Sequence, residues 1–134
     1  MARVTQLDLA NLTIREVNQF LHHELDGSQT AQVDIQNPDG KHSIAAGLDV
    51  EVTVNILGHA GYFVAGMNKQ ASVTIHGNVG WSVAENIMSG TVRVTGHASQ
   101  CTAASGHGGL VVIEGNASSR CGISMKGCDI VVQG

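Results

Sequence analysis

The sequence predicts an all-β fold: a right-handed parallel β-helix preceded by an N-terminal capping α-helix. Two observations predict this fold. β-Branched residues recur at two fixed offsets within a 19-residue unit, and one glycine recurs at the same interval. The recurring glycines are Gly58, Gly77, Gly96, Gly115 and Gly134. A repeat of this length is typical of a solenoid in which each unit forms one coil and stacks on its neighbours.

Residues 1–38 are expected to form a capping segment with a helix near residues 14–25. Thr13 and Glu16 have the spacing of a capping box at the start of that helix, and Gly27 supplies a stop signal. An open end of a β-helix exposes unpaired backbone groups, so we expect the helix to cover the first coil. Residues 33–35 are expected to form a short strand that leads into it.

Residues 39–134 are expected to form about five coils, of which the first, beginning at Asp39, is degenerate. Each coil contains two β-branched positions that flank one other residue, which is typical of a strand with one buried face. The expected inward residues are Val54, Val73, Val92, Val111 and Ile130, and Ile56, Ile75, Val94, Ile113 and Val132. The same residue types recur at the same offsets, as stacked parallel strands require, and parallel crossovers are right-handed.

Two further columns support the stacking. A small residue recurs as Ala46, Ala65, Ala84, Ala103 and Gly122. The recurring glycines are expected to form structural corners, where the backbone needs a positive φ or where two coils approach closely. Since aromatic residues are only 3% of the chain, the core must consist of aliphatic side chains.

Charge and hydropathy exclude several classes of protein. Seven Lys and Arg against eleven Asp and Glu give a net charge of −4, which disfavours a nucleic-acid-binding protein. No apolar run approaches the length of a membrane-spanning helix, and the first residues carry no signal-peptide core. We therefore expect a cytoplasmic protein without nucleic-acid or membrane partners.

The histidines and cysteines invite a metal or catalytic interpretation. His59 and His97 share one offset but lie two coils apart, about 9.6 Å, which is too far for one zinc ion. With Asn78 and Asn116 at the same offset, they fit a ladder of hydrogen-bonded turns.

Cys101, Cys121 and Cys128 lie at three different offsets and are expected to be free thiols in a reducing compartment. The glycine-rich residues 106–109 match no phosphate-binding motif. We therefore expect no catalytic residue, no metal site and no cofactor in this chain. The rival interpretation is a β-helix enzyme, such as an acyltransferase or a zinc hydratase, but those enzymes have an 18-residue period.

The outward strand position changes from polar to apolar along the column, which indicates contact with another surface. The candidate partner interface consists of Leu110, Val112 and Val131, with Arg120 and Lys126 expected near it and Glu85 and Asn86 as a weaker patch. Gly134 also begins a sixth unit that the sequence does not complete, which leaves a strand edge for a partner to cover.

Residues 58–69 and 77–90 resemble the GXGXG β-helix family, whose domain closes the large subunit of glutamate synthase and recurs in formylmethanofuran dehydrogenase. Residues 105–110 and 114–127 are similar to the small GXGXG subunit of methylamine–glutamate N-methyltransferase, also called N-methylglutamate synthase. Such subunits continue for several more coils. This sequence is therefore expected to lack a remainder, or to be a short variant that a partner covers.

The resemblance implies a structural subunit that works beside two other chains. One partner would be similar to a glutamine amidotransferase, and the other would be an FMN-binding, glutamate-synthase-like subunit that holds the flavin. The expected reaction of the complex exchanges the amine of glutamate for methylamine. The alternatives are the GXGXG domain of an ammonia-transferring glutamate synthase and the β-helix subunit of formylmethanofuran dehydrogenase, since the partner chains would choose the substrate.

Overall fold

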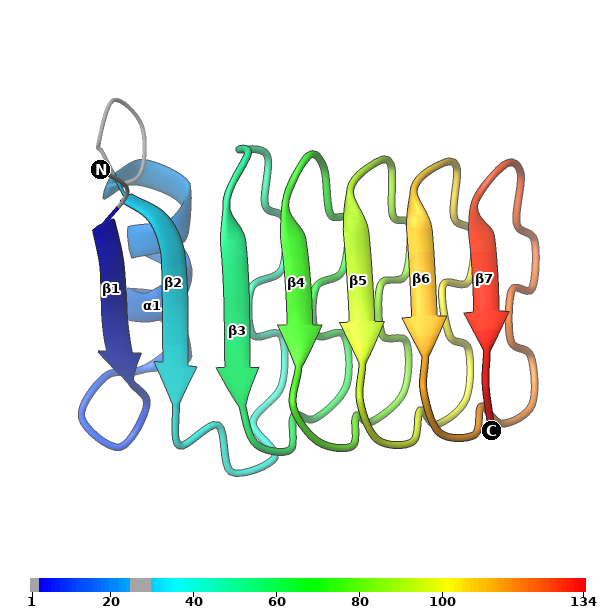
Figure 1. Ribbon diagram of the computed structural model, residues 1–134, viewed down its shortest axis with the longest axis horizontal. Coiled ribbons are helices and arrows are strands. Elements are labelled where there is room, and N and C mark those ends of the chain that lie inside the picture. Colours follow the sequence, from blue (N-terminus) through cyan, green and yellow to red (C-terminus); the bar gives the residue numbers. More distant parts are fainter. Residues whose placement is uncertain (1–2, 25–29) are drawn as a thin grey trace.

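The computed structural model, which describes residues 3–24 and 30–134, is a parallel β-solenoid built on one seven-stranded sheet (Figure 1). All neighbouring strands are parallel, and their order in the sheet is their order in the chain. The strands are β1 (Arg3–Asp8), β2 (Thr30–Gln36), β3 (Thr53–Leu57), β4 (Ser72–Ile75), β5 (Thr91–Val94), β6 (Leu110–Ile113) and β7 (Asp129–Val132). Each strand runs down the near side, and the chain returns behind the sheet toward the next strand on its right, so the solenoid is right-handed, as predicted.

The repeat fixes the register from β3 to β7. Val54 lies opposite Val73 and Ile56 opposite Ile75, and the same shift of one unit continues through every later pair. The inward β-branched side chains of β3 to β6 are fully or almost fully buried. In β7, Ile130 is half-buried and Val132 is exposed, because no further coil in the described chain lies against them.

The first coil departs from the 19-residue unit that was expected to begin at Asp39. Val33 lies opposite Val54, an offset of 21 residues, so this coil contains extra residues. The column of buried small residues is also shifted by one residue in the first coil. Ala84 donates its N–H to the carbonyl of Val64, whereas Ala65 donates to that of Ile44, so Ala45 and not Ala46 is the first member of the column.

The turn segments behind the sheet have an unexpected backbone. Phe63, Ala65 and Met67 all have positive φ values, between 54° and 58°. The same alternation recurs at Ser82, Ala84 and Asn86, at Cys101, Ala103 and Ser105, and at Arg120, Gly122 and Ser124. The N–H groups of Phe63 and Met67 donate to the following coil, and that of Ala65 donates to the preceding one. These hydrogen bonds offset a conformation that costs a non-glycine residue about 1–2 kcal/mol.

The corner glycines are required mainly by close approach of the coils. Among the five, only Gly58 has a positive φ, at 144°. A Cβ atom on Gly77 would lie 2.9 Å from the carbonyl carbon of Gly58, closer than real Cβ atoms come. The same crowding of one corner against the preceding corner recurs at Gly96, Gly115 and Gly134. The corners therefore keep the coils at strand spacing.

The predicted helix begins as expected but changes its pitch. Helix α1 (Ile14–Gln19) starts with the predicted capping box between Thr13 and Glu16, and it continues as the π-helix η1 (Phe20–Glu24). Gly27, the predicted stop signal, lies outside the described residues. The helix packs behind β1 and β2, which both extend the solenoid sheet (Figure 1). β2 contains the predicted strand at residues 33–35, whereas β1 was not predicted.

The loop between β1 and α1 is held by Asp8. Its carboxylate accepts hydrogen bonds from the side-chain amide of Asn37 and from the N–H of Ala10, both at 2.8 Å. These donations, that of Asn37 first, hold the pKa of Asp8 below its usual value. Asp8 therefore ties the N-terminal strand to the first corner.

Asn18 takes the place of a preceding coil at the N-terminal end of the solenoid. In later coils, the N–H groups of Ala65 and Ala84 donate to the coil before them. At the first coil, the N–H of Ala45 donates instead to Oδ1 of Asn18 at 2.9 Å, and Nδ2 of Asn18 donates to the carbonyl of Ser43. One side-chain amide thus supplies hydrogen-bond partners for both the N–H and the carbonyl at the end of the turn segment.

Replacing Asn18 with Ala should lower the free energy of unfolding by about 1–3 kcal/mol, because the buried N–H of Ala45 would lose its acceptor. The measurement is a urea titration followed by far-ultraviolet circular dichroism. Gln19→Ala, at the neighbouring exposed position, is the matched control and should change the free energy little. Equal stability of the two variants would contradict the capping role.

Candidate functional site

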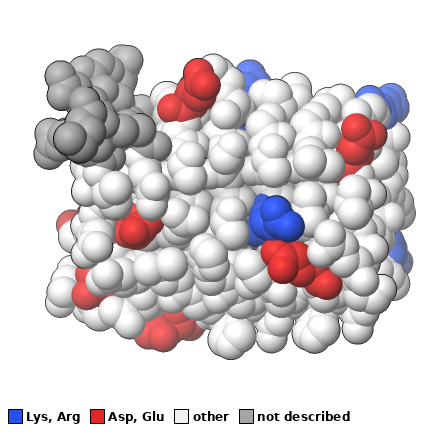
Figure 2. Space-filling view, in the orientation of Figure 1, with Lys and Arg blue, Asp and Glu red and all other residues white. Residues whose placement is uncertain are grey.

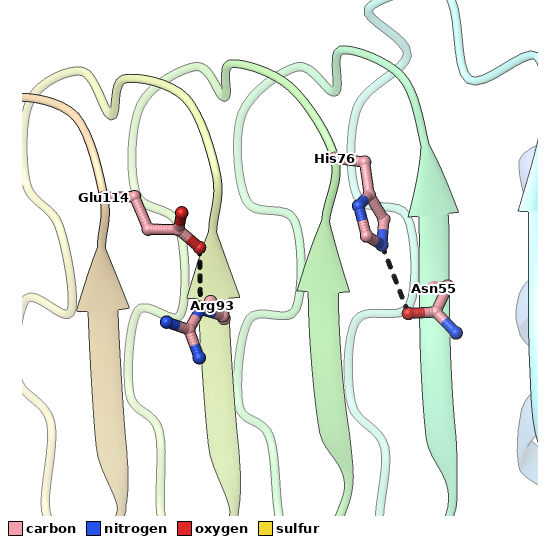
Figure 3. Close-up of polar contacts among 4 residues, drawn as sticks. All are labelled: Asn55, His76, Arg93 and Glu114. Atoms are coloured by element: carbon pink, nitrogen blue, oxygen red, sulfur yellow. Dashed lines mark hydrogen bonds and ion pairs between the residues drawn. The ribbon is translucent and has the colours of Figure 1, made fainter.

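The outer face of the sheet carries a chain of polar side chains on consecutive strands. Nε2 of His76 lies 3.3 Å from Oδ1 of Asn55 (Figure 3). Nδ2 of Asn55 donates to Oδ1 of Asp34 at 3.1 Å. Further along the sheet, Nε of Arg93 lies 2.7 Å from Oε2 of Glu114. Asn55 and Asp34 are direct partners in the sheet. The other two contacts run diagonally, because His76 and Glu114 each lie two residues beyond the register partner of Asn55 or Arg93.

In the part of the sequence that the structure describes, this polar chain contacts neither a nucleophile nor a group of metal-binding side chains. Among the described residues, no hydroxyl or thiol hydrogen-bonds to His76, so the imidazole lacks a nucleophile to activate. Residues 3–24 and 30–134 likewise contain no group of three His, Cys, Asp or Glu side chains that could hold a metal ion. The arrangement satisfies polar groups along the strands, as cross-strand pairs do in other sheets.

The predicted apolar wall is smaller than expected. Leu110 and Val131 are 36% and 44% exposed, but Val112 is only 9% exposed, although it faces outward in register with Arg93. The expectation that all three side chains lie on the surface is therefore wrong for Val112. Figure 2 shows that most of this face carries no charged side chain. Leu110 and Val131 remain the candidate interface residues on it.

The four polar candidates lie away from that wall. Arg120 lies in the last turn segment, and the turn segments are behind the sheet (Figure 1). Arg120 has the same position in its coil as Cys101 in the preceding one. Lys126 lies in the connection that returns to β7. Glu85 and Asn86 lie in the turn segment two coils earlier. The structure therefore does not gather Arg120 and Lys126 with Leu110 and Val131 on one surface.

The corner ladder forms as predicted. Nδ1 of His59 accepts a hydrogen bond from the N–H of Asn78 at 2.9 Å, and Oδ1 of Asn78 accepts one from the N–H of His97 at 2.7 Å. Nδ1 of His97 then accepts from the N–H of Asn116 at 2.9 Å. Each side chain is an acceptor for the next coil, so these imidazoles carry no proton on Nδ1. Their role here is structural.

His59→Ala should lower the free energy of unfolding by about 0.5–1.5 kcal/mol, whereas His59→Asn should retain stability because an amide oxygen already serves at Asn78. Urea titrations at neutral pH, followed by circular dichroism, test this. Equal stability of the His59→Ala variant and the parent chain would contradict it.

The cysteines are free, as expected, and two of them have unreactive surroundings. Cys128 is buried, and burial raises the pKa of its thiol above the usual value. Cys121 is exposed, and desolvation by its surroundings raises the pKa of its thiol. Reactive cysteines have a lowered pKa, so neither residue has the character of a nucleophile at neutral pH.

Sequence reasoning missed two features. Asn68 is completely buried in the aliphatic core, where its Nδ2 donates to the carbonyls of Ala71 and Ser89 while its Oδ1 has no partner. Tyr62 and Trp81 are exposed on neighbouring coils, and His42 stacks on Tyr62 with ring centroids 3.6 Å apart. The 19-residue spacing of Tyr62 and Trp81 was the available signal for the second feature.

The chain has a partial match among known proteins. The chain is 52% identical over 57 residues to Protein GlxC of Rhizobium meliloti (strain 1021). This match spans 42% of the chain and 25% of the length of that protein. No family model and no solved structure matches the chain. Within the described residues, the helix is too short and too polar to cross a membrane.

Proposed function

We propose that this chain is a non-catalytic structural subunit of a glutamate-synthase-like complex, most specifically of methylamine–glutamate N-methyltransferase. The observation that carries the proposal is that the segments resembling GXGXG subunits are the ones that form the repeated corners and turn segments. The partial similarity to Protein GlxC supports the same role. The alternatives are the corresponding domain of an ammonia-transferring glutamate synthase and the β-helix subunit of formylmethanofuran dehydrogenase.

In this role the solenoid acts as a rigid spacer between two other chains. Neighbouring coils are about 4.8 Å apart, so five coils form a column about 24 Å long. An amidotransferase-like chain and an FMN-binding synthase chain would bind to its surfaces and supply the chemistry. The polar clusters of the described residues serve stacking, which fits a subunit that positions its partners.

Co-expression of the chain with amidotransferase-like and FMN-binding chains encoded beside it should yield a complex that forms N-methylglutamate from glutamate and methylamine. The purified single chain should show neither a flavin spectrum nor turnover. Mass spectrometry of the product checks the reaction. Flavin or stoichiometric zinc in the single chain would contradict the proposal, and neighbouring genes for methanofuran chemistry would favour the formylmethanofuran enzyme.

The Leu110→Asp plus Val131→Asp double variant should release the chain from this complex, because charges would replace the exposed aliphatic side chains of an interface. Both side chains point outward, so circular dichroism should retain its β-sheet signal. Leu57→Asp is a single-charge control, since Leu57 is similarly exposed on β3, four strands away from β7. Co-purification of the double variant with both partners would contradict this interface.

A further inference from the structure

A groove crosses the corners through which the turn segments return to the sheet. The hollow has a volume of about 490 Å³, and its lining includes Asp49, Met67, Lys69, Asn86, Met88 and His107. These residues come from several consecutive coils. We call this hollow the corner groove.

One wall of the corner groove is a column of residues in register. Backbone hydrogen bonds from Lys69 to Leu48, from Met88 to Asn68 and from His107 to Ile87 repeat the same step from coil to coil. The next step, from the N–H of Lys126 to the carbonyl of Gly106, places Lys126 beside His107 in the last coil. The column is therefore Asp49, Lys69, Met88 and His107, which line the hollow, and Lys126, which continues the column one coil beyond that lining.

The cations of this column are unpaired. In the described part of the chain, the only ion pair joins Arg93 to Glu114 on the outer face of the sheet. Lys69 and Lys126 are exposed and have no carboxylate within ion-pair distance. In a chain whose net charge is −4, this column leaves cationic groups free to attract an acidic partner.

The groove also has an apolar component. Met67 and Met88 are 47% and 42% exposed and lie on neighbouring coils. Met88 belongs to the column, between Lys69 and His107, and Met67 also lines the groove. Exposed methionines are enriched at binding surfaces, because their flexible thioether chains adapt to different apolar side chains. The amide of Asn86 also lines the groove and can donate to a peptide carbonyl.

We propose that the corner groove binds an extended acidic segment of a partner protein that also carries aliphatic side chains. Its carboxylates would face Lys69, His107 and Lys126, and its aliphatic side chains would cover Met67 and Met88. From Asp49 to Lys126 the column spans four coil steps, about 19 Å, which an extended segment of about six residues matches. This proposal stands independently of the function proposed above.

Charge and surface chemistry favour a peptide over a nucleic acid. Two lysines and one histidine are few for a phosphate backbone, and the acidic chain repels it elsewhere. A segment that mixes acidic and aliphatic residues complements both parts of the groove.

The test is fluorescence polarisation with a labelled peptide of about six residues in which glutamate and leucine alternate. The full chain should bind it, and raising the salt concentration from about 50 to about 300 mM should weaken binding several-fold. A peptide with glutamine in place of glutamate should bind at least tenfold more weakly, about 1.4 kcal/mol. Binding that depends on neither charge nor salt would overturn the proposal.

Double variants test whether the peptide binds in the corner groove. Lys69→Glu plus Lys126→Glu should weaken peptide binding at least about tenfold, and Met67→Gln plus Met88→Gln should weaken it several-fold. Arg15→Glu plus Arg120→Glu, which makes the same change in net charge outside the groove, should leave the affinity within about twofold. Circular dichroism verifies folding, and the Lys69→Gln plus Lys126→Gln variant should show an intermediate loss.

Three outcomes would overturn the proposal. An equal loss in the control variant would show a general effect of net charge. Unchanged binding in the methionine variant would remove the apolar contact. Tighter binding of inorganic polyphosphate or single-stranded DNA than of the acidic peptide would indicate a general anion site.

Discussion

The stacking distance between coils is the constraint on which the rest of this structure depends. Neighbouring parallel strands lie about 4.8 Å apart, and every turn segment and corner must keep that distance. The backbone can do so only if each coil satisfies the hydrogen-bonding groups of the coils on both sides. Corner glycines such as Gly77 and Gly96 meet the requirement by having no Cβ atom where two chains almost touch.

The same constraint explains the left-handed residues of the turn segments. The N–H groups of Phe63 and Ala65, which are two residues apart and both have positive φ, donate to opposite neighbouring coils. In a strand, N–H groups point to opposite neighbours at successive residues instead. The turn segments are therefore a second hydrogen-bonded layer, and the solenoid is held together on both sides of its aliphatic core.

Sequence patterns identified the parts of the fold that repeat without variation. The strands from β3 to β7 and the corner ladder were predictable because side chains of one type stack at one interval. The first coil was not, because its extra residues move Ala45 into the place predicted for Ala46. Nor could composition show that Val112, though outward-facing, is almost covered. The candidate surfaces were predictable only in part, since they depend on how long side chains lie across neighbouring coils.

The alternation of imidazole and amide in the corner ladder has a consequence for how the length of such a protein can change. At each corner of the ladder, one side-chain atom accepts a hydrogen bond from the backbone N–H of the next coil, whether the side chain is histidine or asparagine. A whole 19-residue unit can therefore be added or deleted without leaving a corner without its hydrogen bond. Adding part of a unit would instead shift the register of every later coil. Over evolutionary time, the separation of partners bound at two levels would change only in whole steps. The length of the solenoid can therefore change only in increments of one coil.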